Sequence, residues 1–234
     1  MGVKYLDSTT STNEYIKQNP SSFYHLDAVY TMCQTNGRGR MGRNWSAEGG
    51  IALSIFVGDA NNPMLIPLCA AIAVYNSLEK SGVNNLGIKW PNDILVDGKK
   101  LCGILCEGVI GGYIVGIGVN NKQTNNYFEN ADLPYATSMK ILGYNPLCEE
   151  MFVELCIKEL EKALKLSSEE LVSLFTDKCV NLGKMVKIIK NDSEIIAKAV
   201  DVSIDGGLVV ECEGQKQTII SGEVSVKGIY GYGE

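Results

Sequence analysis

The stretch GRGRMGRNWSAEGGIALSIFVG, residues 37–58, decides which kind of α/β fold the chain can adopt. It matches G-x-G-x-x-G at residues 37–42, directly after an expected strand at 28–33. A dinucleotide-binding fold would need a helix to begin at this loop, because the helix N-terminus holds the pyrophosphate. Here a turn-forming segment, NWSAEGG, is followed by a second apolar strand at 51–58. The stretch therefore predicts a loop between two strands and excludes the dinucleotide-binding fold.

The same loop contains every arginine of the chain: Arg38, Arg40 and Arg43. All other basic residues are lysine, and the chain is acidic, with 21 Lys plus Arg, 27 Asp plus Glu and a net charge of −6. A guanidinium group is planar and permanently charged, so it suits carboxylates and phosphates, while glycine lets the backbone approach a ligand. The alternatives are a solvated basic turn or an RNA-binding patch, but an acidic chain argues against general nucleic-acid affinity. The loop therefore predicts a site for a small anion.

Hydrophobic periodicity predicts an α+β unit around this loop. Leu68, Ile72 and Tyr75 recur at helical spacing, and the Asp-Gly pair at 97–98 is a favoured two-residue hairpin turn. We expect strands at 3–6, 28–33, 51–58, 87–90 and 113–120, a hairpin over 94–108, and helices at 11–18, 63–80, 146–165 and 168–180.

After Gly183 the composition changes to short β-rich runs separated by turn-forming residues. Five strands are expected there: MVKII, IIAKAVDVS, LVVEC, QTII and VSVKG. Five short strands in so small a segment predict a small β-barrel. We therefore expect two domains, residues 1–182 and residues 183–234.

The composition is that of a soluble globular protein, with 45% hydrophobic and 21% charged residues. The eight cysteines contain no C-x-x-C pair and mostly lie among apolar neighbours, which is typical of reduced core residues in a cytoplasmic protein. No apolar run approaches the ~18 residues of a membrane span, and no signal peptide precedes the first expected strand. We therefore expect a cytoplasmic protein without membrane association.

Six motifs occur in an order that is typical of one family: STN (11–13), GRGRMGRNW (37–45), KWPND (89–93), KKLCGIL (99–105), GIGVN (116–120) and SGEVS (221–225). On these motifs the chain resembles the biotin–protein ligases, in the short form that starts at the catalytic domain without an N-terminal DNA-binding domain. The resemblance implies an α+β fold, in which a mixed-sheet catalytic domain of the biotin/lipoate ligase type precedes a small C-terminal SH3-like β-barrel.

The resemblance also implies the reaction. Biotin and ATP, accompanied by Mg²⁺, would give biotinyl-5′-AMP, and biotin would then pass to a lysine of a biotin carboxyl carrier protein domain, in acetyl-CoA carboxylase or a similar carboxylase. A lipoate or octanoate ligase of the same fold is the alternative, and the arginine loop followed by Trp, together with KWPND, favours biotin. Because only two residues precede the first strand and the net charge is −6, no DNA binding is expected. The identity of the acceptor protein and the oligomeric state, for which a homodimer is one option, are left open.

The catalytic residues implied by the family are Lys89, Arg40 and Lys100. The biotin carboxylate must attack the α-phosphate, and two unit negative charges at ~4 Å repel each other by about 4 kcal/mol at an effective dielectric near 20. Fixed cations are therefore needed. By resemblance, Lys89 sits between the two anions, Arg38 and Arg40 line the intermediate, and Arg43 points toward the ATP phosphates.

The remaining site residues follow from the same resemblance. Biotin would contact Ser11, Thr12, Asn13, Gln34, Gly37, Arg38, Arg40, Lys89, Gly103 and Gly116. ATP and the adenylate would contact Arg38, Arg40, Arg43, Trp45, Asn92, Asp93, Lys100 and Asn120. Turn chemistry is the structural alternative for the Asn, Asp and Gly residues among them. The Ser8-Thr9 pair competes with Ser11-Thr12 for the biotin role, Asn92 and Asp93 would help to hold Mg²⁺, and no dedicated metal site is predicted.

Cleavage by an Arg-specific protease tests whether the arginine loop responds to ligand, because the loop holds all the cleavage sites. Three like charges and three glycines make residues 37–43 costly to order without an anion. We expect rapid cleavage of the free protein, and cleavage at least about tenfold slower with biotin and ATP. Equal rates with and without ligands would contradict a loop that closes on its ligand.

Overall fold

The computed structural model describes residues 2–58, 60, 62–190, 193–220 and 225–227. Its larger part is a seven-stranded mixed sheet with the order β1-β2-β3-β7-β6-β5-β4. The strands are β1 (Val3–Tyr5), β2 (Ala28–Thr31), β3 (Gly50–Val57), β4 (Leu86–Lys89), β5 (Asp93–Val96), β6 (Lys99–Val109) and β7 (Gly112–Asn120). Only the β1–β2 pair is parallel, and the loop at 37–45 joins two antiparallel neighbours, as predicted.

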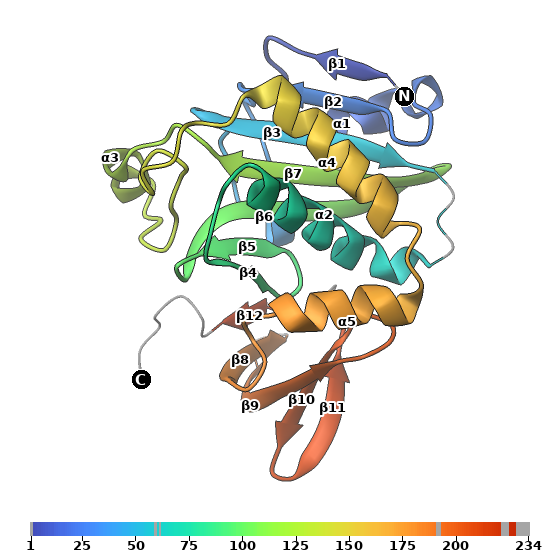
Figure 1. Ribbon diagram of the computed structural model, residues 1–234, viewed down its shortest axis with the longest axis vertical. Coiled ribbons are helices and arrows are strands. Elements are labelled where there is room, and N and C mark those ends of the chain that lie inside the picture. The colour runs from blue at the N-terminus through green and yellow to red at the C-terminus, as the bar shows by residue number, and fades with distance from the viewer. Residues whose placement is uncertain (1, 59, 61, 191–192, 221–224, 228–234) are drawn as a thin grey trace.

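Alternation along β3 assigns the two faces of this sheet. Leu53 and Ile55 belong to the main hydrophobic core, whereas Phe56 packs with Ile16 in a separate cluster. The main core lies beneath helices α2 (Ile66–Lys80) and α4 (Glu149–Ala163) (Figure 1). The second cluster lies under α1 (Thr12–Gln18), so α1 covers the opposite face. Because successive strand residues alternate in direction, even-numbered residues of β3 point toward α1.

The predicted helices and hairpin are confirmed, with small shifts at their ends. The 97–98 turn has positive φ at Asp97 (48°) and Gly98 (76°). A tight two-residue hairpin turn requires this conformation, and an Asp-Gly pair adopts it readily. Helix α5 (Ser168–Lys178) begins with a capping box, in which Ser167 and Glu170 bond each other's backbone N–H. Helix α3 (Asn125–Asn130) was not predicted.

The C-terminal segment folds into a five-stranded antiparallel sheet with the order β11-β10-β9-β8-β12. Its strands are β8 (Met185–Lys190), β9 (Ser193–Val202), β10 (Leu208–Cys212), β11 (Gln215–Ile219) and β12 (Ser225–Lys227). All five predicted strands are therefore confirmed, with β11 and β12 at the edges of the sheet. Residues 221–224 of the predicted SGEVS motif lie outside the described residues.

The two sheets share one hydrophobic core, which continues from α2 into β8, β9 and β10. The indole N–H of Trp90 donates a hydrogen bond of 2.9 Å to the carbonyl of Gly206. Leu65 and Leu68 pack within 3.2 Å of the position that a Cβ on Gly206 would occupy. A domain boundary after residue 182 stays a prediction.

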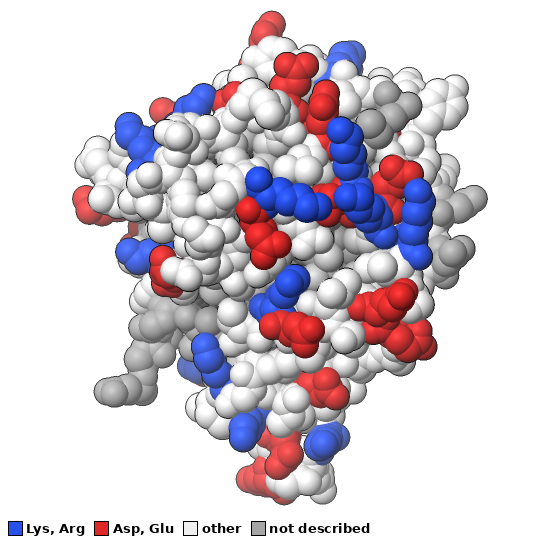
Figure 2. Space-filling view, viewed as in Figure 1, with Lys and Arg blue, Asp and Glu red and all other residues white. Residues whose placement is uncertain are grey.

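The eight cysteines are all free thiols, but only four are buried; Cys33 and Cys148 are exposed. Because Cys106 and Cys212 are partly buried against the main core, six of the eight lie in or against it, as expected for most of them. Over the face formed by α2, α4 and α5, lysine and acidic side chains lie interspersed (Figure 2). Within the described residues, no helix has both the length and the apolar character that crossing a membrane requires.

Candidate active site

A row of paired residues crosses five neighbouring strands of the large sheet. Lys89, the last residue of β4, pairs with Asp93 of β5, and Asp93 pairs with Gly103 of β6. Gly103 pairs with Gly118 of β7, which pairs with Ala52 of β3. Residues opposite each other on neighbouring strands share one face of the sheet, and Ala52 is on the α1 face. The row thus places a cation, a carboxylate and two glycines on that face.

The glycines of β7 leave room for two other side chains of the site. A Cβ added to Gly118 would lie 2.5 Å from the ring of Trp45, and one added to Gly116 would lie 2.4 Å from Oδ1 of Asn13. Both distances are shorter than any normal contact. Trp45 and Asn13 can therefore lie directly on the sheet only because these two positions lack side chains.

The arginine loop, residues 37–45, forms a small hairpin next to the sheet face that carries this row. The backbone N–H of Trp45 donates to the carbonyl of Gly37 at 2.9 Å, and that of Gly39 donates to the carbonyl of Arg43 at 2.7 Å. Gly37 is buried, and a Cβ there would lie 2.3 Å from the carbonyl oxygen of Trp45. The hairpin can close only with glycine at this position.

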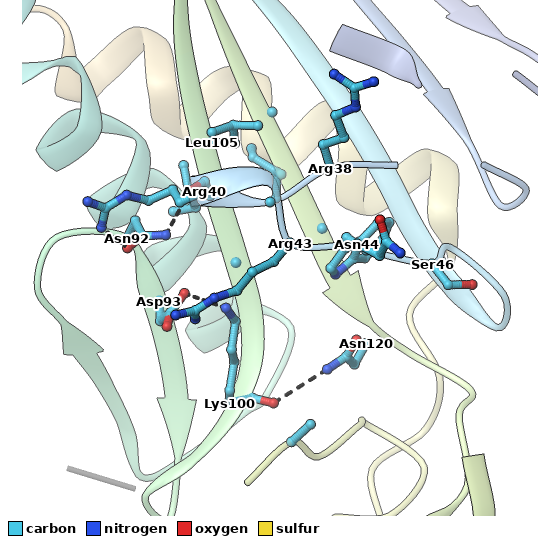
Figure 3. A pocket seen from close by; sticks show the side chains of 18 of the residues that line it. Arg38, Arg40, Arg43, Asn44, Ser46, Asn92, Asp93, Lys100, Leu105 and Asn120 are labelled. Atoms are coloured by element: carbon cyan, nitrogen blue, oxygen red, sulfur yellow. Dashed lines mark hydrogen bonds and ion pairs between the residues drawn. The ribbon is translucent and has the colours of Figure 1, made fainter. Parts of the chain in front are cut away.

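The hairpin directs two of its guanidinium groups toward β5 and β6. Arg40 Nη1 donates to Oδ1 of Asn92 at 2.9 Å, and Asn92 Nδ2 donates to the carbonyl of Ile104 at 3.0 Å. Figure 3 shows Arg43 reaching toward Asp93 and Lys100, whereas Arg38 points away from both of the other arginines. The predicted grouping of Arg40 and Arg43 is present, while Arg38 lines the cavity with its guanidinium turned outward.

Lys89 is the most deeply buried cation of the row, with 7% of its surface exposed. Burial lowers its pKa to about 8, against the opposing attraction of Asp93. Repulsion from Lys100, Arg43 and Arg40 lowers the pKa further. Before an anion enters, the positive charges on Lys100, Arg40 and Arg43 therefore disfavour the charged form of Lys89.

Lys100 completes the cluster and also fastens one wall of the site. Its Nζ lies 2.6 Å from Oδ1 of Asp93 and 3.1 Å from where a Cβ on Gly103 would be. Its backbone N–H donates to the carbonyl of Tyr135 at 2.8 Å, and its carbonyl accepts from Asn120 Nδ2 at 3.4 Å (Figure 3). One residue thus joins the charged row to the segment that follows β7.

A second group of polar side chains lies at the N-terminal end of α1. The backbone N–H of Thr12 lies 2.7 Å from Oε1 of Gln34, and its Oγ1 lies 3.1 Å from the same oxygen. Ser54 Oγ, on the α1 face of β3, lies 2.7 Å from Thr12 Oγ1 and 2.5 Å from Asn13 Oδ1. Thr12, Asn13 and Ser54 are all buried. Such a buried cluster of mutually bonded polar groups suits a small polar group of defined shape.

The charged row lines one cavity of about 370 Å³ together with Thr12, Asn13 and Gln34, while Ser54 lies behind Thr12 and Asn13 and does not line it. Every predicted site residue lines it except Gly37, which closes the hairpin behind it. Ser11 and Thr12 line the cavity, whereas Ser8 and Thr9 do not. Within the described residues, no three His, Cys, Asp or Glu side chains are grouped so as to hold a metal ion.

The sequence alone does not reveal three parts of the site. Gly118 belongs to the GIGVN motif without a predicted role, and Ser54 lies in a run that is predicted only as an apolar strand. A polar residue inside the otherwise apolar run IALSIFVG was the signal that could have revealed Ser54. The wall formed by Tyr127, Phe128 and residues 132–136 was missed because its segment has no regular hydrophobic period.

Comparison with known proteins gives this arrangement a family. The Biotin/lipoate A/B protein ligase family matches residues 5–122, and the Biotin protein ligase C terminal domain matches residues 182–227. The bifunctional ligase/repressor BirA of Escherichia coli (strain K12) is 28% identical over 239 residues, which cover 96% of this chain and 74% of that protein. The biotin--[acetyl-CoA-carboxylase] ligase of Mycobacterium tuberculosis is 29% identical over 241 residues, covering 95% and 89%.

A solved structure agrees with these relatives. The biotin protein ligase from Aquifex aeolicus, in complex with biotin and ATP, has a TM-score of 0.85 and 30% identity, and the match covers 97% of this chain and 98% of that one. The chain belongs to the biotin/lipoate protein ligase family. Within that family it is an enzyme of the biotin protein ligase type.

Gly116→Ala tests whether Asn13 depends for its position on the missing side chain at Gly116. The new methyl group would displace the Asn13 amide from Ser54, while the strand itself stays paired. We expect biotin affinity to fall at least about tenfold, with little change in melting temperature. Gly108→Ala is the matched control, because its Cβ would meet only Tyr113 Cε1 at 3.9 Å, an ordinary contact. Equal biotin affinities in the two variants would show that Asn13 does not depend on the missing side chain.

Proposed function

We propose that the protein activates biotin with ATP and transfers it to a lysine of a carrier domain. In the first step, a biotin carboxylate oxygen attacks the α-phosphorus of ATP, so biotinyl-5′-AMP forms and pyrophosphate leaves. In the second step, a neutral lysine amine of the carrier attacks the acyl carbon of this mixed anhydride, so an amide forms and AMP leaves. The observation that carries the proposal is Lys89, a buried cation that lines the same cavity as the polar side chains of Thr12 and Asn13.

The electrostatics of the cavity support the first step. Two anions brought to ~4 Å repel each other by about 4 kcal/mol at an effective dielectric near 20. Lys89, Lys100, Arg40 and Arg43 repel one another in the free protein, so bound anions relieve this repulsion while the cations offset the repulsion between the anions. Lys89 and Lys100 are held by the strands and by Asp93 before the ligands arrive, so these two cations need little reorganisation at the moment of reaction.

The two ends of the cavity match the two substrates. The buried cluster of Thr12, Asn13 and Gln34 supplies directed donors and acceptors for the ureido ring of biotin. Gly103 and Gly116 leave a floor along which the apolar valeryl chain can lie against backbone. The aromatic walls at Trp45 and at residues 127–128, together with the amide of Asn120, suit an adenine ring. Ser11 and Arg38 line the cavity and complete the predicted biotin contacts, to which Gly37 contributes through the hairpin that it closes.

Mg²⁺ enters as the cation carried by ATP, whose charge it partly neutralises. Asp93 is the carboxylate of the charged row, and it is already paired with Lys100. With Asn92 beside it, Asp93 offers oxygen ligands to a metal ion held mainly by the phosphates. The acceptor is proposed to be a biotin carboxyl carrier protein domain of a biotin-dependent carboxylase.

Exchange of labelled pyrophosphate into ATP tests the proposed first step. We expect exchange that depends on biotin, and rates at least about a hundredfold lower with lipoate or octanoate. The dithiolane ring of lipoate and the methyl end of octanoate cannot form the hydrogen bonds that the polar cluster offers. The second step is checked by label transfer to a carrier domain, with a carrier whose acceptor lysine is changed to arginine as the control. Exchange with lipoate and none with biotin would make the protein a lipoate ligase of the same fold.

The pH dependence of biotin binding tests the role of Lys89. Its pKa in the free protein is lowered to about 8, chiefly by burial, and a bound carboxylate favours the charged form. Above that pKa, binding must first add a proton, so the dissociation constant should rise about tenfold between about pH 7 and about pH 9.

Lys89→Gln should bind biotin more weakly, lose the pH dependence and slow adenylation by about 10²–10³. Lys122→Gln, which removes an exposed ion pair with Glu149, should behave like the wild type. A flat profile for the wild-type protein would contradict the assignment.

A further inference from the structure

Behind the polar cluster lies an ion pair that the proposed reaction does not use. Glu107 of β6 places Oε2 2.6 Å from Nδ2 of Asn13 and Oε1 2.7 Å from Nζ of Lys17. Lys17 is also held by Glu14, at 2.9 Å on the same helix. Asn13 lines the main cavity, whereas Glu107 does not and instead lines a separate cavity behind it.

The charge on Glu107 fixes the orientation of the Asn13 amide. A carboxylate paired with a lysine only accepts hydrogen bonds, so the Asn13 NH₂ group must face it. The Asn13 carbonyl then faces Ser54 and can only accept, at a separation of 2.5 Å. The Ser54 hydroxyl must therefore donate its single proton to Asn13.

The same reasoning sets the direction of the next bond. Ser54 has given its proton to Asn13, so the 2.7 Å contact between Ser54 and Thr12 is filled by the Thr12 proton. The longer 3.1 Å contact from Thr12 Oγ1 to Gln34 then carries no proton, and Gln34 Oε1 instead accepts from the Thr12 backbone N–H at 2.7 Å. Both lone pairs of the Thr12 hydroxyl remain, on a residue that lines the cavity.

We propose that Glu107, held by Lys17, is a positioning residue. It sets which partner donates in each hydrogen bond from Asn13 through Ser54 to Thr12, so that the Thr12 hydroxyl presents an acceptor to a ring N–H of biotin. The inference rests on the proposed function and adds a determinant of specificity to it. An ionised carboxylate permits only one direction along the chain. A neutral amide at position 107 can either donate to or accept from Asn13, so it would leave only the weaker 3.5 Å contact between Asn13 Nδ2 and the Leu105 carbonyl to favour one direction.

The variant Glu107→Gln tests this directly, with two ligands compared by direct binding. The first is biotin, and the second is the carbamate analogue in which oxygen replaces one ring N–H. The wild-type protein should reject the carbamate, because its oxygen would meet the Thr12 acceptor. In Glu107→Gln, we expect biotin affinity to fall about tenfold and the preference for biotin over the carbamate to fall at least about tenfold. Turnover at saturating biotin, and the KM for ATP, should stay within about twofold.

Two further variants serve as a control and as a second test. Glu14→Gln removes the other partner of Lys17 without touching Asn13, so biotin affinity and the preference ratio should match the wild type. Ser54→Ala interrupts the chain at its middle and should lower the ratio as Glu107→Gln does, with less than additive effects in the double variant.

An unchanged ratio in Glu107→Gln or in Ser54→Ala would overturn the inference, as would equal losses of affinity for both ligands. Biotin binding by the wild-type protein is measured first. Its absence would overturn the proposed function, and this inference with it, whereas normal binding with an unchanged ratio would overturn the inference alone.

Discussion

Burying the ammonium group of Lys89 is the constraint on which the rest of the site depends. An isolated buried charge costs several kcal/mol, so the position is tenable only with a carboxylate opposite, which Asp93 supplies in register on the next strand. Asp93 is shared with Lys100, and Arg40 and Arg43 add further positive charge nearby. The cations outnumber the carboxylate in this row. The protein thus holds, in its free state, an electrostatic arrangement that is completed only by anionic ligands.

The large sheet separates stability from chemistry. On one face, β3 contributes Leu53 and Ile55 to the core under α2 and α4, and on the other it contributes Ala52 and Ser54 to the site. The site face can therefore carry glycines and buried polar groups, because the opposite face supplies most of the apolar burial. A single residue shift in the register of β3 would exchange the two faces, so the same pairing that builds the core also aligns the site.

Much of this could be predicted from the sequence where local chemistry decides the structure. The hairpin turn at Asp97 and Gly98 needs positive φ, and the helix over α4 needs only i+4 spacing, so both were recognisable. The cation positions followed from motifs with fixed order. The wall around Tyr135 could not be predicted, because it is held by backbone bonds to β6 that leave no pattern in its own residues.

Individual contacts were harder still to foresee. Glu107 appears in the sequence as one charged residue at the end of a strand, and its partners Asn13 and Lys17 lie some ninety positions away. Arg38 lines the same cavity as Arg40, but its guanidinium points away from Arg40 and Arg43, a direction that the sequence does not indicate (Figure 3). Such outcomes depend on how a loop closes, which composition and spacing do not specify.

The placement of the two tryptophans has an optical consequence. Trp45 lies half-buried over Gly118 at the cavity, whereas Trp90 is almost fully buried and bonded to Gly206 of the C-terminal sheet. An indole in contact with water emits at longer wavelength than one in a dry core, and soluble quenchers reach only the former. The intrinsic fluorescence of the protein therefore contains two separable signals. Trp45 reports on what occupies the cavity, whereas Trp90, which also borders the cavity, reports in addition on whether the two sheets remain docked.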